Sequence, residues 1–215
     1  RVAFSPDLSI VSMEKEIAEV CGGATKVFAD IGAEVTDEIP DFTGVLEAFQ
    51  TLRAVLFATM MEPVLHQHRN KIAPEIIGNI ERGLNIKPSQ IFEAERVRIE
   101  LFKKILLFFE THDFLICPAA SIAPFPVDQR YVTEIDGKPC ETYIDWFSIT
   151  FALTMTACPT ISVPCGFTSE GLPVGIQIMG KPRGEAALLL VAKRFEQAIG
   201  ISAKLPITPQ KLKLI

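Results

Sequence analysis

The sequence contains none of the common motifs for a nucleotide, a cofactor or an exposed serine nucleophile. It has no G-x-S-x-G segment, which would present a serine on a sharp strand-to-helix turn. It also has neither G-x-x-x-x-G-K-[ST] nor G-x-G-x-x-G, the glycine-rich loops that cradle phosphates. These absences argue against P-loop nucleotide enzymes, dinucleotide-dependent enzymes and α/β-hydrolases, and we expect no cofactor.

Long runs of like charge and long apolar runs are absent as well. The formal net charge is −5, and no basic stretch indicates a nucleic-acid partner. The longest uninterrupted apolar run, Ala186–Ala192, is far shorter than the ~20 residues that a membrane-spanning helix needs. We therefore expect neither a nucleic-acid partner nor an association with membranes.

The cysteines form no C-x-x-C pair, the spacing that is typical of redox and zinc sites. There are 5 of them, an odd number, which favours reduced thiols in a cytoplasmic protein. The chain opens without a methionine and without a secretory signal, directly on the strand-like run Val2–Phe4. We expect a cytoplasmic protein, and a fragment of a longer polypeptide.

Helical and strand-like patterns alternate along most of the chain. A strand at Val2–Phe4, a helix with Ser12 as its N-cap and a strand within residues 33–39 predict a parallel β-α-β unit. Further helices are predicted at Gly44–Ala58, Glu62–Arg69, 74–83, 88–112, Thr142–Leu153 and 184–200, and further strands at Asp113–Pro118, Ile161–Val163 and Pro173–Met179. The predicted fold class is α/β, with a mixed, largely parallel sheet covered by helices.

Single side chains offer few candidates for catalysis. His66 and His68 lie on different faces of a helix, which suits no shared metal ion, and we expect no metal site. Cys117 ends a buried strand, where open α/β sheets bind ligands, but no base stands near it in the sequence. It is either a nucleophile or a packed core thiol. Asp145 and Glu141 are either a catalytic carboxylate pair or part of a solvated helix face.

The span Tyr143–Phe195 resembles the C-terminal part of the amidase signature family. The resemblance is carried by TACPTISVPCGF and EGLPVGIQIMGKPRGEAALLLVAKRFE, which match the family pattern S-V-P-x-G followed by G-L-P-V-G-x-Q-I-x-G. DFLICPAASIAPFP resembles the strand and proline-rich loop of the family, and the strand-helix-strand from RVAFSPD to GAEVTDE resembles the part after its catalytic region. The resemblance is weakest over Phe42–Asn85.

This resemblance implies a hydrolase that cleaves carboxylic amides. The family uses a Ser–Ser–Lys set within a Gly/Ser-rich segment, and this sequence has no Gly-Ser-Ser-Gly run. We therefore assign no catalytic residue, and expect residues 1–215 to be the C-terminal portion of an amidase signature domain that is inactive alone. Two alternatives stay open: a non-catalytic partner-binding subunit or amidotransferase-like component, and an independent hydrolase that uses Cys117 or Asp145.

Four residues are candidates for the wall of the substrate pocket. Pro118 and Ala119 follow the buried strand, at the end where α/β sheets bind ligands. Tyr143 and Trp146 are amphipathic side chains on the predicted aromatic helix. The expected partners are a small-molecule amide substrate and the remaining N-terminal part of the same protein, and a homodimer stays open.

Overall fold

The computed structural model describes residues 1–201, so the last part of the expected domain, 202–215, lies outside it. One sheet contains β1 (Val2–Phe4), β2 (Val35–Thr36), β3 (Phe114–Pro118), β6 (Thr160–Phe167) and β7 (Pro173–Gly180). A separate hairpin contains β4 (Glu134–Ile135) and β5 (Lys138–Pro139). The helices are α1 (Lys15–Asp30), α2 (Val45–His68), α3 (Pro74–Leu84), α4 (Pro88–Thr111), α5 (Ser148–Thr154) and α6 (Glu185–Ile199), with 3-10 turns η1 (Arg69–Lys71) and η2 (Asp145–Phe147).

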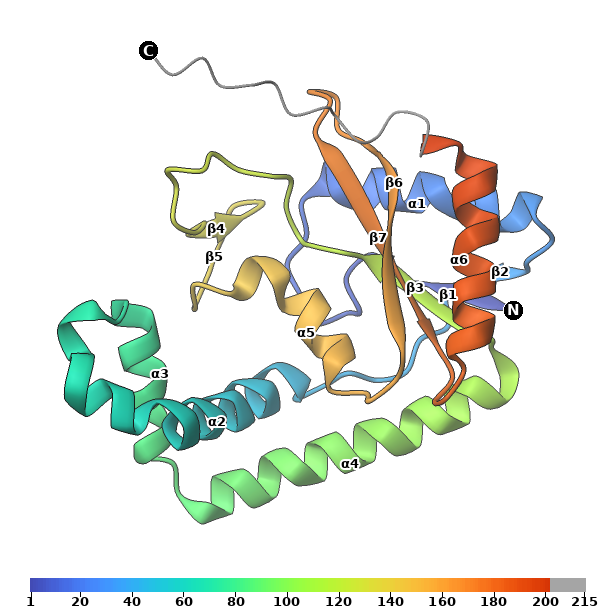
Figure 1. Ribbon diagram of the computed structural model, residues 1–215. Helices are drawn as coiled ribbons and strands as arrows, with labels where there is room; N and C mark the ends of the chain where they lie inside the picture. The colour runs from blue at the N-terminus through green and yellow to red at the C-terminus, as the bar shows by residue number, and fades with distance from the viewer. Residues whose placement is uncertain (202–215) are drawn as a thin grey trace, which may run out of the picture.

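The strand order in the sheet is β2-β1-β3-β7-β6 (Figure 1). Strand β1 is parallel to both β2 and β3, whereas β7 is antiparallel to its neighbours β3 and β6. Four of the five strands therefore run in one direction, with β7 reversed between them. This arrangement confirms the predicted mixed, largely parallel sheet.

Helices cover both faces of the sheet and form two separate cores. Helices α1 and α6 pack on one face, and α2, α4 and α5 pack on the other (Figure 1). In β3, Leu115 and Cys117 belong to the core on the α2 side, whereas Ile116 belongs to the core on the α1 side. The rings of Phe28 and Phe195 stack at 4.6 Å between centroids and join α1 to α6. Among residues 1–201, none of the helices combines the length and the apolar character that crossing a bilayer requires.

The first predicted helix starts later than its pattern indicated. Glu14, and not Ser12, is the residue before α1. The backbone N–H of Glu14 donates to the carbonyl of Ser121, and its carboxylate accepts from the backbone N–H of Ala123, both at 2.8 Å. These bonds join the chain before α1 to the loop after β3. Ser12 is thereby left beside a cavity instead of capping the helix.

The two helices predicted at Gly44–Ala58 and Glu62–Arg69 form one helix, α2, with Pro63 inside it. Proline has no backbone N–H, so Pro63 removes one helical hydrogen bond from α2. Helix α2 packs against both α3 and α4, so tertiary contacts stabilise the continuous helix. The predicted helix Thr142–Leu153 is also different, because residues 142–144 form a turn, η2 follows at Asp145–Phe147, and only the last part is α5.

Strand β6 extends past the proline that was expected to end it. The prediction was Ile161–Val163, but the strand runs to Phe167 and contains Pro164. The N–H of Gly180 donates to the carbonyl of Pro159, so the backbone groups of odd-numbered residues up to Val163 face β7. At position 164 a backbone N–H would point away from β7, so the proline there removes no hydrogen bond between β6 and β7. This is where edge strands tolerate proline.

Candidate functional site

A polar cavity of about 390 Å³ lies on the α2 side of the sheet. It is bounded by the loop after β1, by α2 and α3, and by the segment from the β4–β5 hairpin to α5. Its lining brings together side chains of both charges and several uncharged donors and acceptors: Ser12, Glu47, Gln50, Arg82, Lys138, Glu141, Thr142, Asp145 and Ser148. A small cavity with converging polar groups from several segments is the usual form of a ligand site.

Asp145 holds the wall of the polar cavity in shape. One carboxylate oxygen accepts the backbone N–H groups of Glu141 at 2.6 Å and Thr142 at 2.9 Å. The other oxygen accepts the hydroxyl of Thr142. A carboxylate with three such donors is occupied in stabilising a turn, so Asp145 does not stand free as a base. Glu141 precedes η2 and so does not form a helix-face pair with it.

Tyr143 lies in a neighbouring cavity of about 440 Å³, the Tyr143 cavity, which shares Gln50, Arg82 and Thr142 with the polar cavity. The hydroxyl oxygen of Tyr143 accepts from Arg53 and, at 3.1 Å, from the side-chain amide of Asn79. Since both neighbours donate, the hydroxyl hydrogen of Tyr143 stays available to a ligand.

Arg53 is fixed beside Tyr143 by neutral groups. Its guanidinium donates to the side-chain oxygen of Asn79 at 2.9 Å and lies over the rings of Phe57 and Tyr143, at 4.7 Å and 5.4 Å from their centroids. Within residues 1–201, no carboxylate forms an ion pair with Arg53, whereas Arg82 nearby pairs with Glu47 at 2.8 Å. A fixed cation without a carboxylate partner attracts the oxygen atoms of a ligand.

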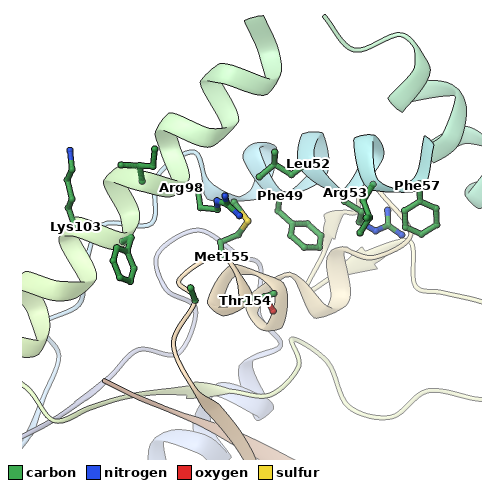
Figure 2. Close-up of a pocket in the computed structure, with 12 residues that line it drawn as sticks. Phe49, Leu52, Arg53, Phe57, Arg98, Lys103, Thr154 and Met155 are labelled. Atoms are coloured by element: carbon green, nitrogen blue, oxygen red, sulfur yellow. The ribbon is translucent and has the colours of Figure 1, made fainter. Parts of the chain in front are cut away.

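An apolar groove of about 740 Å³ lies on the other side of Arg53 (Figure 2). Phe49 of α2 points toward α5, where its ring stacks on that of Phe151, and Met155 at the end of α5 lines the groove as well. Arg98 and Lys103 of α4 also line it. The remaining lining is Leu52, Leu56, Phe57, Ile99, Phe102, Thr154 and Ala157. This groove can therefore hold a purely apolar group close to the polar network of Arg53 and Tyr143.

Two of the four expected pocket residues meet in a further cavity of about 360 Å³, the Trp146 cavity. Ala119 and Trp146 line it together with Phe125, whose ring meets the Trp146 ring edge-on at 5.5 Å between centroids. Ala119 is fixed by its backbone, since its N–H donates to Gly175 at 2.9 Å and its carbonyl accepts from Thr150 at 2.6 Å. The Trp146 cavity is separate from the cavity of Tyr143.

Pro118 lies within the sheet and lines none of these cavities. Its carbonyl accepts from the side-chain amide of Gln177 at 3.0 Å. The same amide lies 3.6 Å from the sulfur of Cys117, which is fully buried. Burial raises the pKa of the Cys117 thiol, so the thiolate that could act as a nucleophile is disfavoured. Cys117 is thus a packed core thiol.

Sequence reasoning did not identify Arg53, Asn79 or Gln50. Arg53 interrupts an otherwise apolar helical segment, TLRAVLF, and this was the available signal. Residues 1–201 contain no cluster of histidine, cysteine and carboxylate side chains that could hold a metal ion. In the same part of the chain, no serine hydroxyl forms a hydrogen bond with a lysine. The Ser5 hydroxyl, for example, accepts from the backbone N–H of Leu8.

Comparison with known proteins gives matches to amidases and to amidotransferase subunits. A family model described as Amidase matches residues 1–189. The acylamidase of Rhodococcus erythropolis is 28% identical over 199 residues, which are 91% of this chain and 42% of that protein. A glutamyl-tRNA(Gln) amidotransferase subunit from Thermodesulfovibrio yellowstonii is 37% identical over 107 residues, 49% of this chain and 21% of that protein.

Two solved structures share the fold. A bacterial aryl acylamidase of the amidase signature enzymes superimposes with a TM-score of 0.80 at 23% identity, over 96% of this chain and 46% of that one. A 6-aminohexanoate cyclic dimer hydrolase superimposes with a TM-score of 0.80 at 21% identity, over 98% of this chain and 46% of that one. The chain spans less than half of the length of these proteins.

Proposed function

Because this chain belongs to the amidase family, we propose that it is part of a hydrolase that cleaves carboxylic amides. The match of the family model over residues 1–189 is the observation that carries this proposal. The acylamidase that is similar over 91% of the chain supports the same activity. Residues 1–215 are proposed as the C-terminal portion of the amidase signature domain.

The proposed reaction is acyl transfer to a serine that lies outside these residues. The serine oxygen attacks the amide carbonyl, the carbon–nitrogen bond breaks, and the amine leaves with a proton. Water then attacks the ester and releases the carboxylic acid and the free serine. The absence of a Gly-Ser-Ser-Gly run supports a nucleophile supplied from elsewhere. This chain alone is accordingly proposed to be inactive.

The role proposed for this chain is to hold the substrate. An amide has one carbonyl acceptor and, unless fully substituted, an N–H donor, so it needs both donors and acceptors around it. The Tyr143 hydroxyl, the Gln50 amide and the Thr142 hydroxyl supply them in the connected polar cavities. Ala119 and Trp146 are proposed as apolar wall, and Pro118 as the residue that fixes the start of the Ala119 loop.

An amidotransferase component is the second candidate. Glutamyl-tRNA(Gln) amidotransferase subunits from several bacteria are similar to this chain, at 25% identity over 205 residues in Alkaliphilus metalliredigens. An independent hydrolase is less well supported by the geometry. Cys117 is sealed in the core, and Asp145 is occupied by three donors.

The test measures hydrolysis of a chromogenic aryl amide by three samples. They are this chain, the part of the Rhodococcus erythropolis acylamidase that lies outside its match with this chain, and the two together. Activity is expected only in the mixture, and a serine-directed sulfonyl fluoride should abolish it. Hydrolysis by this chain alone, lost in Cys117→Ala, would instead establish the independent hydrolase. A mixture that shows no activity would count against the proposal.

A further inference from the structure

Two of the five cysteines touch each other in the core between α1 and the sheet. All five lie within residues 1–201 and are free thiols. The sulfur atoms of Cys21 in α1 and Cys165 in β6 are 3.8 Å apart and share a hydrogen bond, although 144 positions separate the two residues along the chain. Neither thiol takes part in the amide hydrolysis proposed above.

A β-bulge in β6 turns Cys165 toward α1. Strand β6 passes from Pro164 to Gly166 while its partner β7 advances by a single residue, so Cys165 is the extra residue of the bulge. Successive residues of a regular strand point to opposite faces of the sheet. Here Cys165 is buried in the core with α1, and a β-carbon on Gly166 would also point at α1, 2.6 Å from a methyl group of Val20.

The missing side chain at Gly166 lets α1 come close to β6 beside this bulge. Val20 occupies the space that a larger residue at position 166 would need. Cys21, the next residue of α1, therefore reaches the sheet, and its sulfur also lies 3.6 Å from the carbonyl oxygen of Gly175 in β7. The contact between Cys21 and Cys165 thus follows from the bulge and the glycine together.

The other three cysteines lie apart from this pair. Cys117 belongs to the core on the α2 side of the sheet, and Cys158 packs against that same core. Cys140 lines the polar cavity. Oxidation within one folded chain should therefore join Cys21 to Cys165 and to no other cysteine.

Both thiols of the pair are protected while α1 stays in place. Cys21 is fully buried, and Cys165 is exposed by 5%. The hydrogen bond to Cys165, together with burial, raises the pKa of the Cys21 thiol, so the reactive thiolate is scarce. The pair should therefore react slowly, during local openings in which α1 moves away from β6.

We propose that Cys21 and Cys165 form a reversible disulfide under oxidising conditions, and that this bond holds α1 on β6. The reaction breaks both S–H bonds and forms one sulfur–sulfur bond. A two-electron oxidant takes up the two electrons and the two protons, so that hydrogen peroxide, for example, becomes two molecules of water. The sulfur atoms approach from 3.8 Å to about 2 Å, which requires a small adjustment of the side chains and of α1.

The disulfide would form beside the Trp146 cavity. Ile17, one helical turn before Cys21, lines this cavity, and so does Gly175, whose carbonyl contacts Cys21. Glu14, directly before α1, binds the backbone N–H of Ala123 in another wall of the same cavity. Oxidation that holds α1 in place therefore also holds one side of the Trp146 cavity, and reduction releases it.

Non-reducing peptide mapping by mass spectrometry tests the proposal. The folded chain is treated with diamide, whose azo bond takes up two electrons and two protons and becomes a hydrazine. We expect the peptides of Cys21 and Cys165 to become linked within minutes to hours, and dithiothreitol to separate them. The variant Cys140→Ser/Cys158→Ser, which lacks the two partly exposed thiols, should give the same link. The unchanged chain is mapped in parallel, so the result does not depend on how well the variant folds.

Three outcomes of the mapping would overturn the proposal. They are the absence of linked peptides in the folded chain, a link that forms only above the urea concentration that unfolds the chain, and a link from Cys21 or Cys165 to Cys117.

Urea denaturation measures whether the disulfide holds the structure together. A bond that closes so long a loop restricts the unfolded chain, so the urea midpoint of the oxidised chain should rise by about 1 M or more and return on reduction. Cys165→Ala, treated in the same way, should show no rise. Cys117→Ala, which removes a buried thiol from the other core, should still show it.

An unchanged or lower midpoint in a chain with linked peptides would show that the bond does not hold α1 on β6, and the proposal would be wrong. Neither experiment measures amide hydrolysis, so a failure here leaves the proposed function intact.

Discussion

Gly83 of α3 lies so close to Ala54 of α2 that a β-carbon on it would stand 2.0 Å from the Ala54 carbonyl oxygen. The same β-carbon would be 2.7 Å from the β-carbon of Ala58. The close crossing of α2 and α3 therefore depends on the missing side chain at Gly83. This crossing also places Asn79 and Arg82 of α3 beside the polar cavities.

Gly83→Ala should destabilise the chain by about 1–3 kcal/mol, because the helices must move apart. Gly78→Ala is the matched control in the same helix, since a β-carbon there would have nothing within 4 Å beyond its chain neighbours and the backbone of its own helix. The control should stabilise by about 0.5–1 kcal/mol through its better helix propensity. Urea denaturation followed by circular dichroism measures both changes. Equal effects would contradict the close contact.

Tyr143→Phe should cost about 1–3 kcal/mol of folding stability. The change removes the acceptor of Arg53 and Asn79 and leaves two donors without it. Tyr131→Phe is the control, because the Tyr131 ring lies 6.2 Å from that of Tyr143 and no side-chain hydrogen bond of its hydroxyl occurs within residues 1–201. In the active mixture, Tyr143→Phe should also raise KM for the amide. An unchanged KM would remove Tyr143 from substrate binding.

The alkaline stability of the chain should depend on Cys117. Burial raises the pKa of this thiol in the folded state above its ordinary value of 9.0. Above that value only the unfolded chain loses the proton, so stability is complete below pH 9 and falls as the pH rises. At pH 10, one such thiol costs about 1.4 kcal/mol. Between pH 8 and pH 10, the free energy of unfolding of Cys117→Ala should therefore fall less than that of the unchanged chain, as measured by urea denaturation at both pH values. An equal fall in the two proteins would contradict the prediction.

The apolar groove should bind a fluorescent hydrophobic dye such as anilinonaphthalene sulfonate. Leu56, Ile99 and Phe102 are exposed by 55%, 52% and 36% in its wall, and Arg98 and Lys103 suit the anionic group. Phe102→Asp should lower the fluorescence by about half or more, since it places a charge in the groove. Val127→Asp, at a fully exposed loop position, is the control and should change little. Equal losses would show that the dye binds elsewhere.

Much of the fold could be predicted from local patterns, and the exceptions have clear causes. The β-α-β start, α3, α4, β3, β7 and α6 follow from periodicity and from proline and glycine signals. The predicted gap between Ala58 and Glu62 is absent, because packing keeps α2 continuous. Pro164 was expected to end the strand, but an edge strand such as β6 tolerates proline. The turn at the start of the predicted helix Thr142–Leu153 is held by the Asp145 carboxylate, which accepts the backbone N–H of Thr142. A hydrophobic pattern gives no sign of this hydrogen bond.

The candidate site could be predicted only in part. Ala119 and Trp146 do lie together in one cavity, but Tyr143 lies in another and Pro118 in the sheet. Whether they contact a substrate remains a prediction. The network of Tyr143 joins residues that are 64 and 90 positions apart, and a single sequence gives no sign of such long-range pairs.

The chain has a separate core on each face of the sheet, and this limits how far the effect of a substitution in the cavity lining extends. Every segment that borders the polar cavity, from the loop after β1 to α5, belongs to the α2 side, while α1, α6 and their shared core do not reach it. Substitutions that reshape the cavity therefore leave the opposite layer intact. Changes in the lining of the polar cavity can thus accumulate on one face of the sheet without disturbing the packing of α1 and α6 on the other face.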